Sequence, residues 1–231
     1  MKVRLSSSKM DLVDGCPYKA YLQGVLRIEP VTKSSALVHG SVWHKIMEEF
    51  YTHVKTFGWD DVSGAIFAAG KAAKEEWITY QEKYNLYMDY RDFQTEMLML
   101  TRYIETYSQS DEGFLEVIST EEKFELPLRV KSYNKDVSEI TYTGVIDLRC
   151  KMNGLPWLVD HKTTSGSISR EADKLGRSIQ FIGYAWAERQ LYAEAEGFMA
   201  NFAGCSSGKR KTEPGELRIS SSSGILNYSL T

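Results

Sequence analysis

Cysteine is scarce in this sequence: its three copies are Cys16, Cys150 and Cys205, and no two of them form a Cys-x-x-Cys pair. An odd number of widely spaced cysteines argues against a disulfide framework and against a zinc site made of cysteines alone. Such usage is typical of a reducing compartment. We therefore expect an intracellular, cytoplasmic protein.

Long apolar segments are also absent. No run approaches the ~18 residues that a membrane-spanning helix needs, and the N-terminal stretch MKVRLSSSKMDLVDG lacks the apolar core of a signal peptide. We expect no membrane partner. A basic excess is missing as well, because the net charge is -3 and the pI is near 5.9. A nucleic-acid partner would have to be held by local patches or through metal ions.

Proline is rare, with 5 copies, whereas 42% of the 231 residues are hydrophobic. This balance predicts one globular domain, residues 1–231, with a substantial core. Its first part, about residues 1–110, is predicted to be mostly helical. The predicted helices cover residues 6–26, with Ser8 as a cap and a Cys-Pro turn inside, then 34–57, then two or three helices over 60–107.

The pattern changes after about residue 114, and short segments rich in β-branched and aromatic residues predict a sheet over about 114–204. Strands are expected at 116–130, 140–151, 155–162 and 198–203, and a helix is expected from Leu175 to Ala195, stopped by Gly197. The Asn153-Gly154 pair predicts a hairpin between the second and third strands. Residues 205–231 form a loop-rich tail with one weak strand at 216–219.

The stretch LVDHKTT, Leu158–Thr164, ends an apolar segment with an acid and a lysine two positions apart. Side chains alternate along a strand, so Asp160 and Lys162 should point to the same face. A buried acid beside a buried amine is costly unless the pair is used. A surface ion pair at a strand end would have the same sequence, so both interpretations stay open.

Asp147 adds a second acid in an otherwise apolar strand, and the predicted hairpin brings it near Asp160. Two carboxylates ~4–6 Å apart repel each other unless a cation lies between them. Oxygen ligands favour Mg²⁺ or Mn²⁺. Lys162 would then hold a water nucleophile or a phosphate oxygen, as in metal-assisted phosphodiester hydrolysis. The alternative is two aspartates that cap turns.

Two helices carry further polar residues at helical spacing. Gly40, His44 and Glu48 are each four apart and share one stripe. Because glycine costs about 1 kcal/mol inside a helix, Gly40 is expected to allow close approach of another backbone or a ligand. His44 is either a ligand or a core histidine. Gln180 and Tyr184 share a face of the later helix, either as a polar rim or as part of a site.

These residues make the chain resemble the PD-(D/E)XK nuclease superfamily, and its RecB-like exonuclease branch in particular, from about Met10 to Tyr192. The resemblance includes the opening segment DLVDGCPYKAYL. It implies an α/β fold with a restriction-endonuclease-like core, in which helices flank a central mixed β-sheet after an N-terminal helical region. Four motifs carry it in the same order: Gly40-x-x-x-His44-x-x-x-Glu48, Gly144-x-x-Asp147, Asp160-x-Lys162 and Gln180-x-x-x-Tyr184.

The resemblance also implies roles for single residues. The metal, Mg²⁺ or Mn²⁺, would be bound by Asp147, Asp160, the backbone carbonyl of His161 and, as in the RecB-like branch, His44. Lys162 would be the catalytic lysine. Gln180 and Tyr184 would contact DNA or support the active site. Glu121 matches a further acidic position, with Glu122 as the alternative because a shift of one residue changes the face.

The implied function is a metal-dependent DNA exonuclease for recombination, repair or phage or CRISPR DNA processing, encoded by a bacterium, an archaeon or a phage. Its partner would be DNA, as single strands or duplex ends. The alternatives are a structure-specific endonuclease of the same fold and a non-catalytic DNA-binding or scaffold module. The retained residues Asp147, Asp160, Lys162 and His44 disfavour the non-catalytic alternative.

The chain departs from the family pattern at three places. Ile146 stands where the family name has a proline, and His161 stands where an aromatic residue is more usual, so its side chain is expected to point away from the site. Some relatives hold an iron–sulfur cluster with one early and three late cysteines. Cys16 matches the early one, but only Cys205 follows Tyr184, so no cluster is expected.

Contacts to the substrate are open at this stage. Arg170, Lys174 and Arg177 either neutralise phosphates or form a solvated charged loop. The run Lys209–Lys211 is either a phosphate contact or part of a disordered tail. A stripe of aromatic residues either stacks on single-stranded bases or packs between helices; its members are Trp77, Tyr80, Tyr84, Tyr87 and Tyr90.

Overall fold

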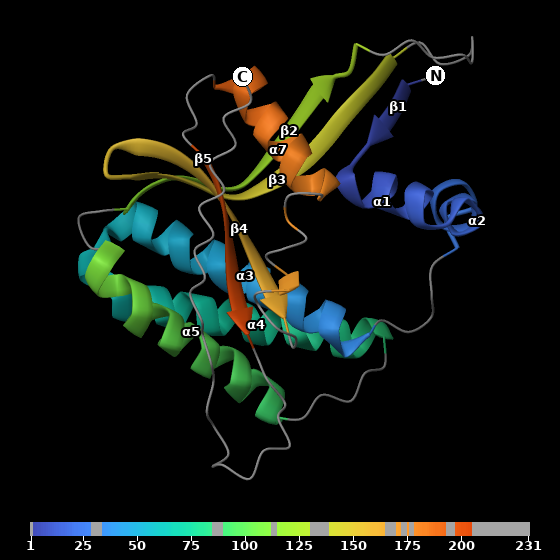
Figure 1. Ribbon diagram of the computed structural model, residues 1–231. Coiled ribbons are helices and arrows are strands. Elements are labelled where there is room, and N and C mark those ends of the chain that lie inside the picture. Colours follow the sequence, from blue (N-terminus) through green and yellow to red (C-terminus); the bar gives the residue numbers. More distant parts are fainter. Residues whose placement is uncertain are drawn as a thin grey trace.

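The computed structural model describes residues 2–28, 34–84, 90–111, 115–129, 139–164, 170–171, 175, 178–192 and 197–204. Helices and strands follow one another along the chain as drawn in Figure 1. The elements are β1 (Lys2–Leu5), α1 (Ser7–Gly15), α2 (Pro17–Ala20), the π-helical turn η1 (Tyr21–Val25), α3 (Ser35–Phe57), the 3₁₀ turn η2 (Trp59–Asp61), α4 (Val62–Tyr84), α5 (Tyr90–Asp111), β2 (Leu115–Pro127), β3 (Glu139–Met152), β4 (Leu155–Thr164), α7 (Ile179–Leu191) and β5 (Gly197–Gly204).

Strand β3 is the centre of a mixed sheet. Strand β2 pairs antiparallel with it along almost its whole length. Two strands share its other edge: β1 pairs in parallel with residues 139–142, and β4 pairs antiparallel with residues 148–152. Strand β5 then pairs in parallel with β4. Within the described residues, the stretch 143–147 of β3 therefore has no strand partner on that edge.

Helices cover both faces of this sheet (Figure 1). Helices α3, α4 and α5 lie on one face, where α3 makes the main contacts with the strands, and α7 and α1 lie on the other. The stripe that predicted α3 is fully buried in the larger of the two main apolar clusters, which confirms the expected core face of this helix. Its members are Val42, Trp43, Ile46, Met47 and Phe50.

The predicted hairpin between β3 and β4 is confirmed. Met152 pairs with Leu155 across the turn, and the two turn residues Asn153 and Gly154 have φ values of 52° and 77°. A two-residue turn of this handedness needs positive φ at both positions, which Asn-Gly adopts more readily than other pairs. The turn fixes the register that places Asp147 and Asp160 at the same level of the sheet.

Three local predictions were wrong. The first helix is capped by Ser6 rather than Ser8, because the Ser6 hydroxyl accepts a hydrogen bond from the backbone N–H of Lys9 at 3.4 Å. The helix expected from Leu175 starts only at Ile179, after the extended residue Ser178. It ends at Leu191, so Gly197 does not stop it and is instead the first residue of β5.

Strand β1 was not predicted. Its four residues KVRL are partly or fully exposed, and they are too few to show a pattern. The strand forms because β3 offers a free edge at residues 139–142. The two long helices α4 and α5 confirm the expectation for residues 60–107.

Some predictions fall outside the described residues: the turn at 134–136, the basic run Lys209–Lys211, the strand at 216–219 and any role of Cys205. The division into one domain with a loop-rich tail also stays a prediction. Among the helices of the described part, none combines the length and the apolar character that crossing a membrane would need.

Candidate active site

Strand β2 breaks its side-chain alternation where it faces α3. The hydroxyl oxygens of Thr120 and of Thr52 in α3 lie 2.9 Å apart. The next side chain, Glu121, also reaches the α3 side, and the alternation resumes with Glu122 on the opposite face. Glu121 has a φ of 47°, a left-handed value that is uncommon for a residue other than glycine and is often found at functional sites.

Strand β3 also interrupts its side-chain alternation, at the position opposite Glu121. Ile146 packs in the cluster under α7, whereas Leu148 packs in the cluster under α3. Asp147 between them faces α3, where it meets His44. The pairing of residues 120 and 122 with 148 and 146 puts Glu121 opposite Asp147. Both strands therefore turn an extra acidic side chain toward the same helix.

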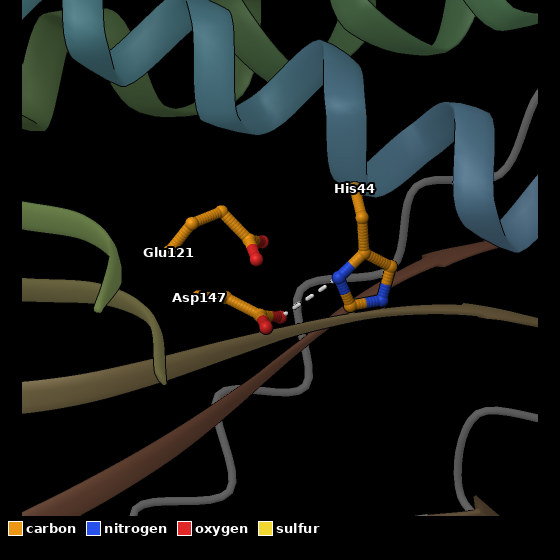
Figure 2. A group of neighbouring side chains, drawn as sticks. All are labelled: His44, Glu121 and Asp147. Carbon is orange, nitrogen blue, oxygen red and sulfur yellow. Dashed lines mark ion pairs between the residues drawn. The ribbon is translucent and has the colours of Figure 1, made fainter. Parts of the chain in front are cut away.

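These two acids and His44 form a compact cluster, which Figure 2 shows. One ligand atom from each of the three residues lies within 4.8 Å of the others. The Nδ1 atom of His44 is 3.1 Å from Oδ2 of Asp147. The sequence left Glu121 and Glu122 of β2 as alternatives. The structure places Glu121 in the cluster and turns Glu122 to the opposite face of the sheet.

The charges of the cluster shift the pKa of each member. Burial raises the pKa of Glu121 to about 7, and the charge of Asp147 adds to this. Burial lowers the pKa of His44, but the hydrogen bond and charge of Asp147 and the charge of Asp160 raise it by more. Burial raises the pKa of Asp147, but the hydrogen bond and charge of His44 lower it by more. A cation in the cluster would favour the ionised acids and the neutral imidazole.

A second polar group lies on the other side of β4. The side chain of Asp160 is 1% exposed, and the ammonium of Lys162 is 2.8 Å from its Oδ2. Gln180 of α7 joins the two, because its amide donates to Asp160 Oδ1 at 2.8 Å and its oxygen accepts from Lys162 at 2.9 Å. The predicted common face of Asp160 and Lys162 is confirmed. Burial raises the pKa of Asp160 to about 6, Lys162 opposes the rise, and Asp147 adds to it.

The two groups meet where β3 and β4 separate. The β3–β4 pairing ends at Leu148 and Val159, and beyond it the backbone N–H of His161 donates to Asp147 Oδ2 at 2.8 Å. The ring of His161 points to the α3 side and stacks on Tyr51 with ring centres 5.8 Å apart. Its nitrogens make no hydrogen bond within the described residues.

One open cleft of about 770 Å³ joins both groups. It is lined by residues of α3, of α4, of the three central strands and of α7. Two lining residues, Lys45 and Thr163, were not singled out from the sequence, although each directly follows a predicted site residue. The Lys45 ammonium lies 2.8 Å from Glu48 Oε2 and from Glu49 Oε1.

Tyr184 closes the cleft on the α7 side and is buried. Its hydroxyl is hydrogen-bonded to Gln180 and to the backbone of Val145, on the open edge of β3. Gly144 permits this approach, because a methyl group there would lie 2.8 Å from the Tyr184 ring and 2.5 Å from that of Phe124. Gly144 therefore shapes the site through packing.

The sequence as a whole agrees with this geometry. Residues 4–219 match the family model of the PD-(D/E)XK nuclease superfamily. The chain belongs to this superfamily. No curated protein matches the sequence. The mixed sheet flanked by helices is consistent with the restriction-endonuclease-like fold of the superfamily, as expected.

Membership of the PD-(D/E)XK superfamily agrees with the metal-binding atoms that the cluster offers. PD-(D/E)XK nucleases typically use divalent metals, and an imidazole with two carboxylates offers one nitrogen and several oxygen ligands to such an ion. The raised pKa of Glu121, caused first by burial and then by the charge of Asp147, is consistent with this, since the cluster holds more negative charge than its one histidine balances. Among the described residues, these three form the candidate metal group, and Asp160 lies next to it.

A network on the far face of the sheet, which the sequence did not indicate, anchors α7 in this nuclease fold. The Arg149 guanidinium is 3.2 Å from Glu122, 3.8 Å from Glu188 and 3.3 Å from the ring centre of Tyr192. The Tyr192 hydroxyl also donates to Glu122. The network ties the C-terminal end of α7 to β2 and β3, behind Glu121 and Asp147.

The predicted DNA contacts are only partly described. Arg170 is exposed, and Lys174 and Arg177 lie outside the described residues. In the aromatic stripe, Trp77 is buried against His39 with ring centres 5.1 Å apart. Tyr80 and Tyr84 stack on each other. Trp77 therefore packs between helices, as one of the two interpretations expected.

His161 supplies a prediction about stability. Burial lowers its pKa to about 4, so at neutral pH the ring is neutral, and among the described residues its two nitrogens have no hydrogen-bond partner. Replacing a buried unsatisfied polar group by an apolar one of similar shape recovers part of a cost of about 1–3 kcal/mol. We expect His161→Phe to raise the Tm and to leave activity within about twofold, because Asp147 is contacted by the backbone of residue 161 and not by the ring.

The matched variant is His161→Ala, which loses the stacking on Tyr51 and should lower the Tm. Thermal unfolding of the three proteins is the measurement. A His161→Phe protein that melts below the wild type would show that the imidazole makes a polar contact that a phenyl ring cannot replace.

Glu121 supplies a prediction about pH. Its folded pKa of about 7 lies above the ordinary value of 4.5, so the folded protein holds this proton more tightly than the unfolded chain. The metal-free protein should lose stability as the pH rises from about 4.5 to 7. A metal ion bound by this cluster would displace this proton and that of His44, so Mn²⁺ should bind at least tenfold more weakly at pH 6 than at pH 8, an order-of-magnitude expectation.

Glu121→Gln checks both statements. The amide cannot titrate, so the metal-free variant should melt above the wild type at pH 8 and close to it at pH 4.5. Calorimetric Mn²⁺ titrations should show weaker binding with a smaller pH dependence. An unchanged pH dependence would remove Glu121 from the cluster.

Proposed function

We propose that the chain is a Mg²⁺- or Mn²⁺-dependent deoxyribonuclease, and that it acts as a RecB-like exonuclease on DNA ends. One observation supports this above all: His44, Glu121 and Asp147 share one cleft with Lys162, whose ammonium is 2.8 Å from the buried Asp160. The acids and the histidine would hold the metal, with Asp160 and the backbone carbonyl of His161 as further ligands. His44 on α3 is the residue whose presence supports the RecB-like branch.

The other residues would act on the substrate. When bound, the metal would supply a Lewis acid for the scissile phosphate and lower the pKa of a water nucleophile. Lys162 donates up to three hydrogen bonds and would hold a phosphate oxygen or the attacking water. Gln180 fixes Lys162 against Asp160, and this preorganisation lowers the cost of orienting the charge. Tyr184 would hold Gln180 in place through the hydrogen bond between their side chains.

The choice of metal follows from the donor set. Imidazole suits Mn²⁺ better than Mg²⁺, although carboxylates accept both. We therefore propose that activity with Mn²⁺ is at least as high as with Mg²⁺. Within the cell, such an enzyme would serve DNA repair, recombination or phage or CRISPR DNA processing.

One assay tests the function. End-labelled single- and double-stranded DNA, linear and circular, is incubated with Mg²⁺, Mn²⁺ or EDTA. The expected result is progressive shortening of linear DNA with either metal, no cleavage of circles and no activity in EDTA. Cleavage of circular DNA would identify an endonuclease of the same fold. Binding without any cleavage would support the non-catalytic module instead.

A further inference from the structure

Strand β2 contains two acids in succession, and the metal cluster includes only the first of them. Glu121 lines the cleft on the α3 side, whereas Glu122 lies on the far face of the sheet, where it meets Arg149 of β3. The side chain of Glu122 is only 25% exposed and does not line the cleft. The role of this second acid must therefore be sought in its contacts on the far face.

Glu122 accepts hydrogen bonds through both of its carboxylate oxygens. Its Oε2 accepts from the hydroxyl of Ser119 and, at 3.2 Å, from the guanidinium of Arg149. Its Oε1 accepts from the hydroxyl of Tyr192, the residue that caps the C-terminal end of α7. Three donors from β2, β3 and the end of α7 thus fix one carboxylate, and hydrogen bonds to a charged group are stronger than those between neutral groups.

The contact between Ser119 and Glu122 depends on the conformation of the chain between them. In a regular strand, side chains three positions apart point to opposite faces. Ser119 and Glu122 nevertheless share the far face, because β2 interrupts its alternation at Glu121, whose φ is 47°. A left-handed conformation is unfavourable for a residue other than glycine, and it persists only where the surrounding contacts hold it.

Contacts on both faces of the sheet hold Glu121 in this conformation. On the α3 side, the hydroxyl oxygens of Thr120 and Thr52 lie 2.9 Å apart. On the far face, Glu122 is bound by its three donors. The residues directly before and after Glu121 are therefore fixed on opposite faces, and the Glu121 carboxylate is directed into the cleft, toward Asp147 (Figure 2).

We propose that Glu122 is a positioning residue for the metal cluster. Bound on the far face, it keeps Glu121 in the left-handed conformation that turns this carboxylate toward the other metal ligands. Without the contacts of Glu122, β2 can return to regular alternation, in which Glu121 would point to the far face. The proposal rests on the proposed function, because the metal is part of that function. Glu122 acts through the backbone of its neighbour and takes no part in the chemistry.

The test is Glu122→Ala in the full-length protein, with Mn²⁺ affinity measured by calorimetry without DNA. The variant should fold, because Arg149 keeps Glu188 and the ring of Tyr192 as partners. Mn²⁺ binding should weaken by about tenfold, the lower end of the loss typical of an outer-shell partner. Glu122→Gln should stay within about threefold of wild type, because its amide can accept from Arg149 and donate to the hydroxyl of Tyr192.

A double-mutant cycle separates positioning from a general loss of stability. If Glu122 acts through Glu121, its removal costs no further affinity once the Glu121 carboxylate is gone. Glu121→Ala alone should weaken Mn²⁺ binding by about tenfold or more, and adding Glu122→Ala should change the affinity by less than about twofold. A purely structural role of Glu122 would instead give additive losses.

Glu125→Ala is the matched control on the same strand. Glu125 pairs with Arg4 at 3.1 Å and does not line the cleft, so this variant should bind Mn²⁺ as the wild type does. Wild-type affinity in Glu122→Ala or in Glu121→Ala, or additive losses in the cycle, would overturn the positioning role. Failure of the proposed function is distinguishable from these results, because then the wild type itself would not cleave DNA in the presence of metal.

Discussion

Asp160→Asn should lower kcat for DNA cleavage by roughly 10²–10³-fold or more, because this carboxylate holds Lys162 and, in the proposed function, would also bind the metal. The fold should survive, because asparagine has nearly the same shape and can still accept from Gln180. The pKa of Asp160 is raised to about 6, so the ionised acid destabilises the metal-free protein above that pH. At pH 8 the variant should therefore melt no lower than the wild type.

A matched control also replaces a buried carboxylate by its amide, but at a position outside the cleft. Glu96 is a buried carboxylate, 2.6 Å from His39, and it does not line the cleft. Glu96→Gln should keep wild-type kcat even if its Tm changes. Activity of Asp160→Asn within about threefold of wild type, or cleavage by the wild type in EDTA, would contradict the assignment of Asp160 and of the metal.

Regular periodicity explains what the sequence could predict of this site. Alternation with period two put Asp160 and Lys162 on one face, and the structure agrees. Helical spacing put His44 beside the apolar stripe of α3, and it lies there. In both cases a single element decides the direction of the side chains, so local rules are sufficient.

Periodicity fails where two strands depart from it together. Glu121 and Asp147 reach the same helix only because β2 and β3 both interrupt their alternation at paired positions. A left-handed residue at Glu121 has no sequence signal, since glycine, asparagine and aspartate are the usual residues there. This is why Glu121 and Glu122 could not be separated from the sequence, and only the pairing with β3 decides between them.

The helix boundaries around α7 show a related limit. Residues 175–195 have a helical composition, but Ser178 is extended and Leu175 closes a turn onto it through a 3.0 Å backbone hydrogen bond. The turn sets where α7 starts, and so it sets where Gln180 meets Asp160. The Arg149 network at the other end of α7 joins residues far apart in the sequence, which no short motif could indicate.

His44→Ala should lower metal affinity by at least about 10–100-fold, the loss typical of an outer-shell partner, and remove most of the activity, because it removes the proposed nitrogen ligand, which lies 3.1 Å from Asp147. The side chain of His44 is 33% exposed in the cleft, so its loss leaves no closed cavity and the Tm should change little. A core histidine would behave in the opposite way, since its variant would unfold more easily and the folded fraction would still cleave DNA.

His53→Ala is the matched control on the same helix. His53 lies 2.8 Å from Asp61, the last residue of η2, and does not line the cleft, so this variant should lose stability and keep its specific activity. The measurements are the Tm, calorimetric Mn²⁺ affinity and kcat on one preparation of each protein. A destabilised but active His44→Ala protein would remove His44 from the metal cluster and with it the main support for the RecB-like branch. The group formed by Asp160, Lys162 and Gln180 would remain, because none of its contacts depends on α3.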